Sequence, residues 1–398
     1  MARIALPLLS LLLLVPLVAR ANIPDDKIKI GVLQDLLAAD AADAGNGGIV
    51  AAQLAAGDFE VHAFRDDAEV IPGTVNGATD RVLGQVRDWL DKEHVAAALS
   101  SAGSLVDAEI AKMVARRHRI LLVAANDEGD SGTLCSPNVV VWGAGAAPRA
   151  RAIGRAIAPH GGSQWFLLGD QSPAGLAGQT ALRAVVQAGG GKIVGQADNV
   201  VGGADLGQVM PQIAAANPQA VVLAETDGDL VEILRSALLA GLPHATTLVA
   251  PYARIADIDD AGPAAANGLI VVAPYYWDTD VRTRDFAHRW SDRMAGRHVT
   301  ENAAEVYAAT LSFLNGAKAA DDVDAGKVMA MLRRAPINDS LFGTASIRSD
   351  GRVVYDLNVY RVKTPDAIQR RWAYYSKIAT VPAAQAFPPT PCGSTPTD

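Results

Sequence analysis

Short apolar runs alternate along this chain with longer amphipathic stretches, and this alternation restricts the fold more than any other feature of the sequence. The first series of predicted strands is Ile28–Leu33, Phe59–Phe64, Val95–Leu99 and Ile120–Val123. The spacing of Val82, Val86 and Trp89 predicts a helix over Thr79–Lys92, because residues three or four apart share one helical face. Ser104–Arg117 is a second predicted helix. Strands that alternate with helices indicate βαβ units, and therefore an α/β fold with parallel sheets.

A second series of the same kind begins near Val139–Trp142. Its predicted strands are Trp165–Leu168, Lys192–Val194, Ala220–Leu223, Thr247–Val249 and Leu269–Val272. The predicted helices are Pro148–Ala158, Ala174–Ala188, Asp229–Ala240, Thr283–Arg297, Glu301–Ala320 and Asp324–Arg334. Residues 353–362 and 372–378 are predicted as strands again. Two similar series predict two similar lobes, and the helices after residue 280 allow the chain to cross between the lobes more than once.

The first residues carry the pattern of an export signal. Arg3 precedes an apolar run from Ile4 to Ala19, and Ala19-Arg20-Ala21 matches the small-x-small pattern of a signal-peptidase site. The run of about 16 residues is shorter than the roughly 20 that span a bilayer as a helix. We therefore expect a cleaved signal peptide over residues 1–21, with an uncleaved anchor as the weaker alternative. No cysteine lies near the run, so the sequence predicts a periplasmic protein that is not lipid-anchored.

Charge, length and cysteine content further restrict the possible partners, the number of domains and the state of the cysteines. The net charge of −8 argues against nucleic acid or an anionic membrane surface as a partner. A chain of 398 residues is too long for one typical core, which again predicts two domains. The two cysteines, Cys135 and Cys392, favour a disulfide in an exported protein, with two inert thiols as the alternative.

Several segments, taken in order, resemble one known family. They are KIKIGVLQDL (27–36), VAAQLA (50–55), CSPN (135–138), GGGKIVG (189–195), YYWD (275–278), RSDGRVVYDL (348–357) and WAYYSKIATVP (372–382). Together they make the chain similar to the leucine/isoleucine/valine-type solute-binding proteins of ABC importers, which are type I periplasmic binding proteins.

The resemblance implies an α/β fold of two Rossmann-like lobes with a central cleft and three hinge crossovers, near residues 145, 272 and 350. Lobe 1 would comprise residues 22–145 plus 273–350, lobe 2 residues 146–272 plus 351–381, and a C-terminal strap residues 382–398. Ligand would bind in the cleft at the carboxyl ends of the strands and shift the population toward a closed form. The partners implied are a small-molecule ligand and an ABC permease in the inner membrane, and the family suggests a monomer.

Ser104 is the family-matched residue for a ligand carboxylate. It begins a predicted helix, whose free N–H groups attract anions, and Asp107 stands three residues later. This spacing resembles a capping box with Asp in place of Glu, so a plain helix cap is the alternative interpretation.

The other candidate ligand residues differ from the family pattern in charge. Asp40 stands near the position of a family aromatic residue, and Gln171 stands where Tyr is frequent. Asn126 and Asp127 follow the fourth strand, where the family carries small and hydroxyl residues, and a solvated loop acid is the alternative for Asp127. The remaining candidates are Glu225, Tyr275 and Tyr276. The two tyrosines would line the pocket or pack in the hinge. The acidic set predicts a ligand with a cationic or hydrogen-bond-donating group, such as an amino acid, amine, amide or polyol.

Catalytic patterns in the sequence do not form a complete site. Gly129–Gly132 (GDSG) matches a short protease signature, but the rest of the chain is helix-rich α/β, so we interpret it as chance. Gly189–Lys192 (GGGK) lacks the following Ser or Thr of a phosphate loop. The histidines show no metal-ligand spacing. We expect no enzyme, cofactor or metal; the open alternatives are a ligand sensor that docks on a membrane partner, a binder of an apolar ligand, and a periplasmic enzyme or chaperone on the same scaffold.

Overall fold

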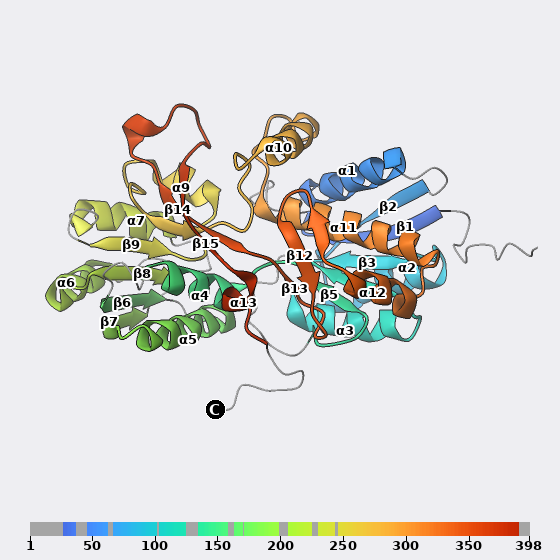
Figure 1. Cartoon of the computed structure of the whole chain (residues 1–398), viewed down its shortest axis with the longest axis horizontal. Helices are drawn as coiled ribbons and strands as arrows, with labels where there is room; N and C mark the ends of the chain where they lie inside the picture. Colours follow the sequence, from blue (N-terminus) through green and yellow to red (C-terminus); the bar gives the residue numbers. More distant parts are fainter. Residues whose placement is uncertain are drawn as a thin grey trace, which may run out of the picture.

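The computed structural model describes residues 27–36, 46–62, 67–101, 103–124, 134–157, 163–169, 171–198, 206–224, 230–242 and 246–389. Within them the chain forms two large sheets that lie side by side, each flanked by helices, and a smaller third sheet (Figure 1). This arrangement confirms the α/β fold class predicted from the alternating pattern. None of the helices in the described part of the chain is long and apolar enough to cross a membrane.

The first sheet is five-stranded and parallel. Its order is β2 (Asp67–Thr74), β1 (Lys27–Gln34), β3 (Ala97–Ser100), β4 (Ile120–Val123) and β5 (Val139–Val141). Leu33 of β1 lies opposite Ser100 of β3, and Ser100 lies opposite Val123 of β4. The central strands are buried on both faces, because helices cover the sheet on each side.

Helices from two distant parts of the sequence cover this sheet. They are α1 (Gly47–His62), α2 (Thr79–Asp91), α3 (Ser104–Ala115), α10 (Val281–Arg293), α11 (Glu301–Ala320) and α12 (Ala325–Arg334). The predicted strand Phe59–Phe64 is wrong, because Phe59 lies in α1 and the strand that follows is β2. Trp290 of α10 donates a hydrogen bond to the Gly47 carbonyl at 2.9 Å, which joins the late helices to the start of α1.

The second sheet is seven-stranded and mixed. Its order is β15 (Tyr375–Val381), β14 (Leu357–Val362), β10 (Ile270–Val272), β9 (Thr247–Ala250), β8 (Ala220–Ala224), β6 (Gln164–Gly169) and β7 (Lys192–Asp198). β14 and β15 are antiparallel, and the other strands are parallel to one another. The surrounding helices are α4 (Ala146–Ile157), α5 (Pro173–Ala188), α6 (Leu206–Ala216), α7 (Leu230–Leu239) and α9 (Ile255–Ala261).

The chain passes between the two sheets at three places in the described residues. It leaves β5 for α4, leaves β10 for α10, and returns through a small third sheet to β14. The third sheet consists of β11 (Ile337–Asp339), β12 (Gly343–Ile347) and β13 (Val353–Val354). Val141 N–H donates to the Gly351 carbonyl at 3.0 Å, so the first and third passages run side by side. Gly351 has φ of 86°, and a Cβ there would lie 2.3 Å from the Val139 carbonyl oxygen, so this approach requires glycine.

The C-terminal part ends with a short helix, α13 (Ala383–Ala386), in the middle of Figure 1. Arg348 donates hydrogen bonds to the carbonyls of Phe387 and Pro388 at 2.8 Å, and this holds the end of the described chain against the third passage. Cys135 is half-buried, and the described residues include no free cysteine. Cys392 lies outside the described residues, so the predicted disulfide stays a prediction.

Candidate functional site

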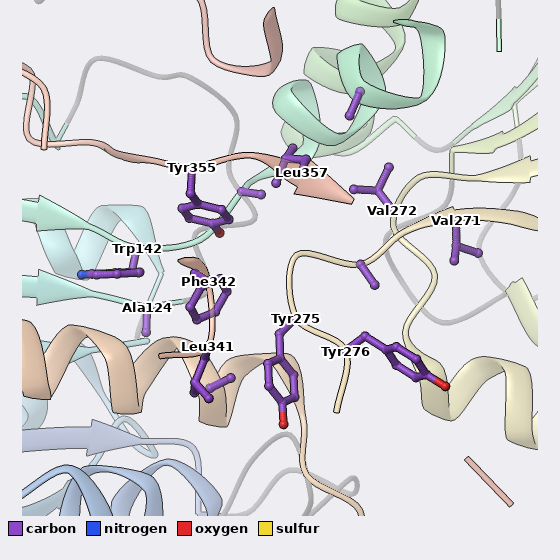
Figure 2. Packing of buried hydrophobic residues seen from close by; sticks show 14 of the residues in the cluster. Ala124, Trp142, Val271, Val272, Tyr275, Tyr276, Leu341, Phe342, Tyr355 and Leu357 are labelled. Carbon is purple, nitrogen blue, oxygen red and sulfur yellow. The ribbon is translucent and has the colours of Figure 1, made fainter. Parts of the chain in front are cut away.

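In both sheets the carboxyl end of a parallel strand leads into one aromatic cluster between the lobes. Trp142 follows β5 on one side, and Val272 ends β10 on the other side (Figure 2). Because the carboxyl ends of parallel strands share one edge, β5 and β10 connect this cluster to the carboxyl edge of each sheet. Open α/β sheets bind their ligands outside such edges. The space beside the cluster, between the two edges, is therefore the candidate site.

We call the rings of Trp142, Tyr275, Phe342 and Tyr355 the hinge cluster. Phe342 lies at the centre, with its ring centroid 5.6 Å from Trp142, 6.4 Å from Tyr275 and 5.0 Å from Tyr355. All four side chains are buried, and each passage between the sheets contributes at least one of them. Burial raises the pKa of the Tyr355 hydroxyl well above its usual value, so this group stays protonated.

A buried carboxyl positions Phe342 in the hinge cluster. The Asp339 carboxylate accepts hydrogen bonds from the backbone N–H groups of Leu341 and Phe342 at 2.7 and 2.8 Å. These bonds fix the tight turn between β11 and β12, and the turn carries Phe342 into the cluster. Burial raises the pKa of Asp339 despite the two N–H donors.

Tyr275 and Tyr276 are neighbours in sequence but pack on different lobes. The Tyr275 ring contacts Phe286 of α10 edge-on at 6.1 Å, and its hydroxyl donates to the Thr283 carbonyl at 3.2 Å. The Tyr276 ring instead packs on Tyr360 and Tyr375 of the seven-stranded sheet, at 5.4 and 5.0 Å. Burial raises the pKa of Tyr276 to about 12. Both residues are 6 % exposed and packed against neighbouring rings; a role in a hinge or in ligand contact stays a prediction.

On the edge of the five-stranded sheet, Ser100 at the end of β3 donates a hydrogen bond to Asp107 Oδ1 at 2.5 Å. Both side chains are buried, so the first turn of α3 is tied to the strand that precedes it. Ser104 begins α3, as the sequence predicted, and Gly103 is its N-cap residue. The start of this helix therefore lies at the carboxyl edge.

Gln34 lies at the same edge and was not among the residues predicted from the sequence. It ends β1, is 1 % exposed, and its Nε2 has no hydrogen-bond partner. A Cβ placed on Gly48 would lie 2.6 Å from this nitrogen, so the amide rests directly on the first turn of α1. A polar residue at the end of an apolar strand was the available signal, and it was visible in the segment KIKIGVLQ.

The edge of the seven-stranded sheet carries Gln171 and Tyr252. Gln171 is exposed and follows β6, two residues before α5 begins. Ser172 caps α5 by accepting a hydrogen bond from the Gly175 N–H at 3.0 Å. Tyr252 follows β9 and was missed; a Cβ on Gly178 would lie 1.6 Å from its hydroxyl oxygen, so the phenol packs on the second turn of α5.

Several predicted site residues lie outside the described part of the chain. They are Asp40, Asn126, Asp127 and Glu225. The structure thus brings Gln171 and the start of α3 to the two carboxyl edges and places both tyrosines in the passage between β10 and α10. The predicted acidic character of the pocket stays a prediction. No group of three or more His, Cys, Asp or Glu residues that could hold a metal ion occurs among the described residues.

A comparison with family models and a comparison with solved structures point to the same family. The sequence matches the family model described as periplasmic binding protein over residues 27–367. Among solved structures, the chain is similar to a branched-chain amino acid ABC transporter periplasmic ligand-binding protein from Burkholderia xenovorans LB400. The two are 28 % identical with a TM-score of 0.84, over 91 % of this chain and 97 % of that chain. A search of the curated proteins found no match.

Two more distant structures share the fold and contain ligands. A solute-binding protein of an ABC transporter from Rhodopseudomonas palustris BisB5, in complex with 3,4-dihydroxybenzoic acid, is 17 % identical with a TM-score of 0.75. The alignment covers 90 % of this chain and 98 % of that chain. A substrate-binding protein from Desulfitobacterium hafniense, in complex with Leu, is 18 % identical with a TM-score of 0.71, over 88 % of this chain and 100 % of that chain.

Proposed function

The chain belongs to the periplasmic binding protein family, and from that premise we propose that it captures a small polar molecule by hinge closure for an ABC importer. The ligand is an amino acid, amine, amide or small carboxylate. Similar proteins of this fold were solved with Leu and with 3,4-dihydroxybenzoic acid, and one is named for branched-chain amino acids. The family consists of binding proteins, and we assign no catalytic step to this chain.

One observation carries this proposal: the carboxyl ends of parallel strands in both sheets lead to a common hinge cluster that all three passages of the chain build. A ligand that touches both edges stabilises the form in which the edges are close together. The ligand shifts the population toward this closed form to the extent that it binds the closed form more tightly than the open form. A closed shape is then available for recognition by an inner-membrane permease.

The finer assignments are part of the proposal. Residues 1–21 are the signal peptide, residues 22–145 plus 273–350 form lobe 1, and residues 146–272 plus 351–381 form lobe 2. A disulfide between Cys135 and Cys392 fastens the strap over residues 382–398. The ligand contacts are Asp40, Ser104, Asn126, Asp127, Gln171, Glu225, Tyr275 and Tyr276, to which the structure adds Gln34 as a candidate.

A thermal-shift screen of residues 22–398 tests this proposal. The panel contains amino acids, aromatic carboxylates, amines, amides and polyols, each in large excess. A ligand at 100 times its dissociation constant stabilises the folded protein by about 2.7 kcal/mol, which raises the melting temperature by a few degrees. Stabilisation by one class is the expected result. The absence of any shift over the whole panel contradicts small-solute capture.

The predicted acidic pocket has its own test within the same screen. Asp127→Asn and Glu225→Gln should each weaken binding of an amine or amino acid at least tenfold, because a carboxylate attracts an ammonium group. Asp366→Asn is a matched control, since Asp366 is exposed in the loop between β14 and β15. Unchanged affinity in both pocket variants means that the pocket is not acidic, while solute capture itself still stands.

A further inference from the structure

Helix α10 lies between the two lobes and is bonded to both of them. Figure 1 shows it between helix α1 and the loop over residues 363–374, which joins β14 to β15. On the side of α1, the Trp290 indole donates a hydrogen bond to the Gly47 carbonyl at 2.9 Å. The Arg289 guanidinium donates to both carboxylate oxygens of Asp58, at 2.8 and 3.0 Å. These bonds join α10 to the start and to the later part of α1.

The segments before and after α10 contact the β14–β15 loop on the other side. Before the helix, the Trp277 indole donates a hydrogen bond to the Trp372 carbonyl at 2.8 Å. The Arg370 guanidinium lies 4.7 Å from the centroid of the Trp277 ring and pairs with Asp278 at 3.1 Å. After the helix, the His298 imidazole stacks on the Trp372 ring, with centroids 4.4 Å apart and an interplanar angle of 8°. One loop therefore holds both flanks of α10.

The β14–β15 loop is itself fastened to the lobe of the seven-stranded sheet. Arg371 donates a hydrogen bond to Asp259 of α9 at 3.0 Å, and the Tyr374 hydroxyl donates to the same carboxylate. At the base of the loop, Lys363 Nζ donates to the Ala373 carbonyl at 2.9 Å. The loop is therefore a fixed part of this lobe, and its stacked ring joins it to the segment that leads into α11.

The backbone of Trp372 adopts a conformation that large side chains rarely have. Its φ is 71°, in the left-handed region, where the Cβ of a bulky residue is crowded by the backbone. The residue is only partly buried, so packing in the core does not account for this conformation. Strained residues persist where their surroundings hold them, and they occur frequently at elements that switch. Trp372 is held by the Trp277 hydrogen bond and by the stack with His298.

We propose that the His298–Trp372 stack is a latch that couples the β14–β15 loop to α10, and through α10 to α1, and so favours one relative arrangement of the two lobes. Rotation of the lobes about the hinge cluster moves α1 relative to the loop, so the stack has to slide or open. An aromatic pair contributes enough free energy beyond its buried area to change an equilibrium constant roughly two- to tenfold. The latch thus changes the populations of the lobe arrangements without contact with the ligand. It rests on the hinge motion of the proposed function, and its first test needs no ligand.

Small-angle X-ray scattering of the ligand-free protein is the first test. His298→Ala removes one ring of the stack, and Trp372→Asn removes the other with a residue that tolerates a positive φ. Both variants should change the radius of gyration in the same direction relative to the wild type. His298→Phe retains a stacked ring and should retain the wild-type radius. Val82→Ala is the control for lost stability alone, because Val82 is buried in α2 and should leave the radius unchanged.

Ligand affinity is the second readout, and a purely structural role would not move it. The probe is L-leucine or 3,4-dihydroxybenzoate, whichever stabilises the wild type in the thermal-shift screen. A latch variant with a smaller ligand-free radius should bind the probe more tightly, and one with a larger radius more weakly, by about threefold or more. The reason is that the apparent affinity follows the fraction of molecules already in the arrangement that binds. His298→Phe and Val82→Ala should keep the wild-type affinity.

The contrary outcomes are specific to the latch. An unchanged radius in both His298→Ala and Trp372→Asn, with only a lower midpoint of urea unfolding, shows a stabilising contact and overturns the latch. Opposite changes of the radius in the two variants, or a smaller radius with weaker binding, also overturn it. A wild-type protein that binds no member of the thermal-shift panel contradicts the proposed function, while a shared change of radius in the two variants still supports the latch.

Discussion

At the scale of single residues, Gln34 is the clearest departure from ordinary packing. Its amide nitrogen is buried at the end of β1 without a hydrogen-bond partner, against Gly48 of α1. A buried polar group without a partner costs about 1–3 kcal/mol, so a protein that retains one gives up stability for another purpose. A role at the ligand site is the purpose that its position supports, because Gln34 lies at the carboxyl edge.

Replacing Gln34 by the similarly shaped methionine should therefore raise the stability of the ligand-free protein by about 1 kcal/mol. Urea unfolding of Gln34→Met measures this as a higher midpoint at an unchanged slope. Gln34→Glu serves as the opposite case, since a buried carboxylate without a partner should lower stability. A Gln34→Met variant that is less stable than the wild type would show that the amide is satisfied in solution.

The residue-scale predictions from sequence were partly testable. Ser104 was placed correctly at the start of a helix, because the turn after a short apolar strand is a local signal. Tyr275 and Tyr276 were recognised as functional or hinge residues, but sequence carried no information on which lobe each ring contacts. Gln34 and Tyr252 were missed because their significance depends on helices far away in sequence, α1 and α5, that pack against them.

At the scale of elements, the best predicted segments were those with clear periodicity or apolar continuity. Helix α2 and strand β4 match their predicted positions closely. Helix α1 was misassigned in part as a strand, because only Gln53 and Gly57 are exposed among its residues of described burial, so its polar stripe is narrow. Strand β2 was missed because it contains Pro72 and charged residues, as an edge strand can.

The loop between β14 and β15 is fastened by a stacked ring pair. The His298 imidazole lies 4.4 Å from the Trp372 ring at an interplanar angle of 8°. The Trp277 indole N–H donates a hydrogen bond to the Trp372 carbonyl at 2.8 Å. The Arg371 guanidinium lies over the Trp372 ring, with its Cζ 4.8 Å from the ring centroid. Burial lowers the pKa of His298 to about 4, with Asp259 raising it and Arg371 lowering it further. The stack therefore holds a neutral imidazole at neutral pH.

This stack should make folding stability depend on pH in a defined direction. The pKa of His298 is about 4 in the folded protein and about 6.5 when unfolded, so the unfolded chain binds the proton first. The contribution of His298 to the free energy of unfolding is fully present above about pH 6.5 and is lost as the pH falls toward about 4. The loss is at most roughly 3 kcal/mol.

The variant His298→Phe keeps the ring stack and removes the titrating group. Urea unfolding at pH 7 and pH 4.5 should show a smaller loss of stability for this variant than for the wild type. An equal loss in the two proteins contradicts a neutral, buried His298. His94 is exposed on the surface, so His94→Phe is the control.

At the scale of the whole molecule, the two lobes are joined by the hinge cluster and by an ion pair. Arg149 of α4 bonds to Glu301 at the start of α11, and their side chains are only 13 % and 21 % exposed. Glu301 therefore links the helices of one sheet to those of the other. The two-lobe architecture was predictable from the doubled βα pattern and the family resemblance. The pairing of charges across the lobes was not, since it depends on how the lobes pack.

Removing only one partner of this ion pair should lower the free energy of unfolding. Arg149→Leu leaves the Glu301 carboxylate in a poorly solvated place and should lower stability by about 3–5 kcal/mol. The double variant Arg149→Leu/Glu301→Leu should recover most of the loss, because neither charge remains. Guanidinium unfolding of the single and double variants measures the coupling. Additive losses in the double variant would contradict a direct pair between the lobes.

Ligand-driven closure of the two lobes can be measured by small-angle X-ray scattering. The radius of gyration of residues 22–398 is measured with and without the ligand that gives the largest thermal shift. We expect a smaller radius of gyration at saturation, because the two carboxyl edges approach each other around the hinge cluster. An unchanged radius with fully bound ligand would contradict closure and place the binding site away from the space between the lobes.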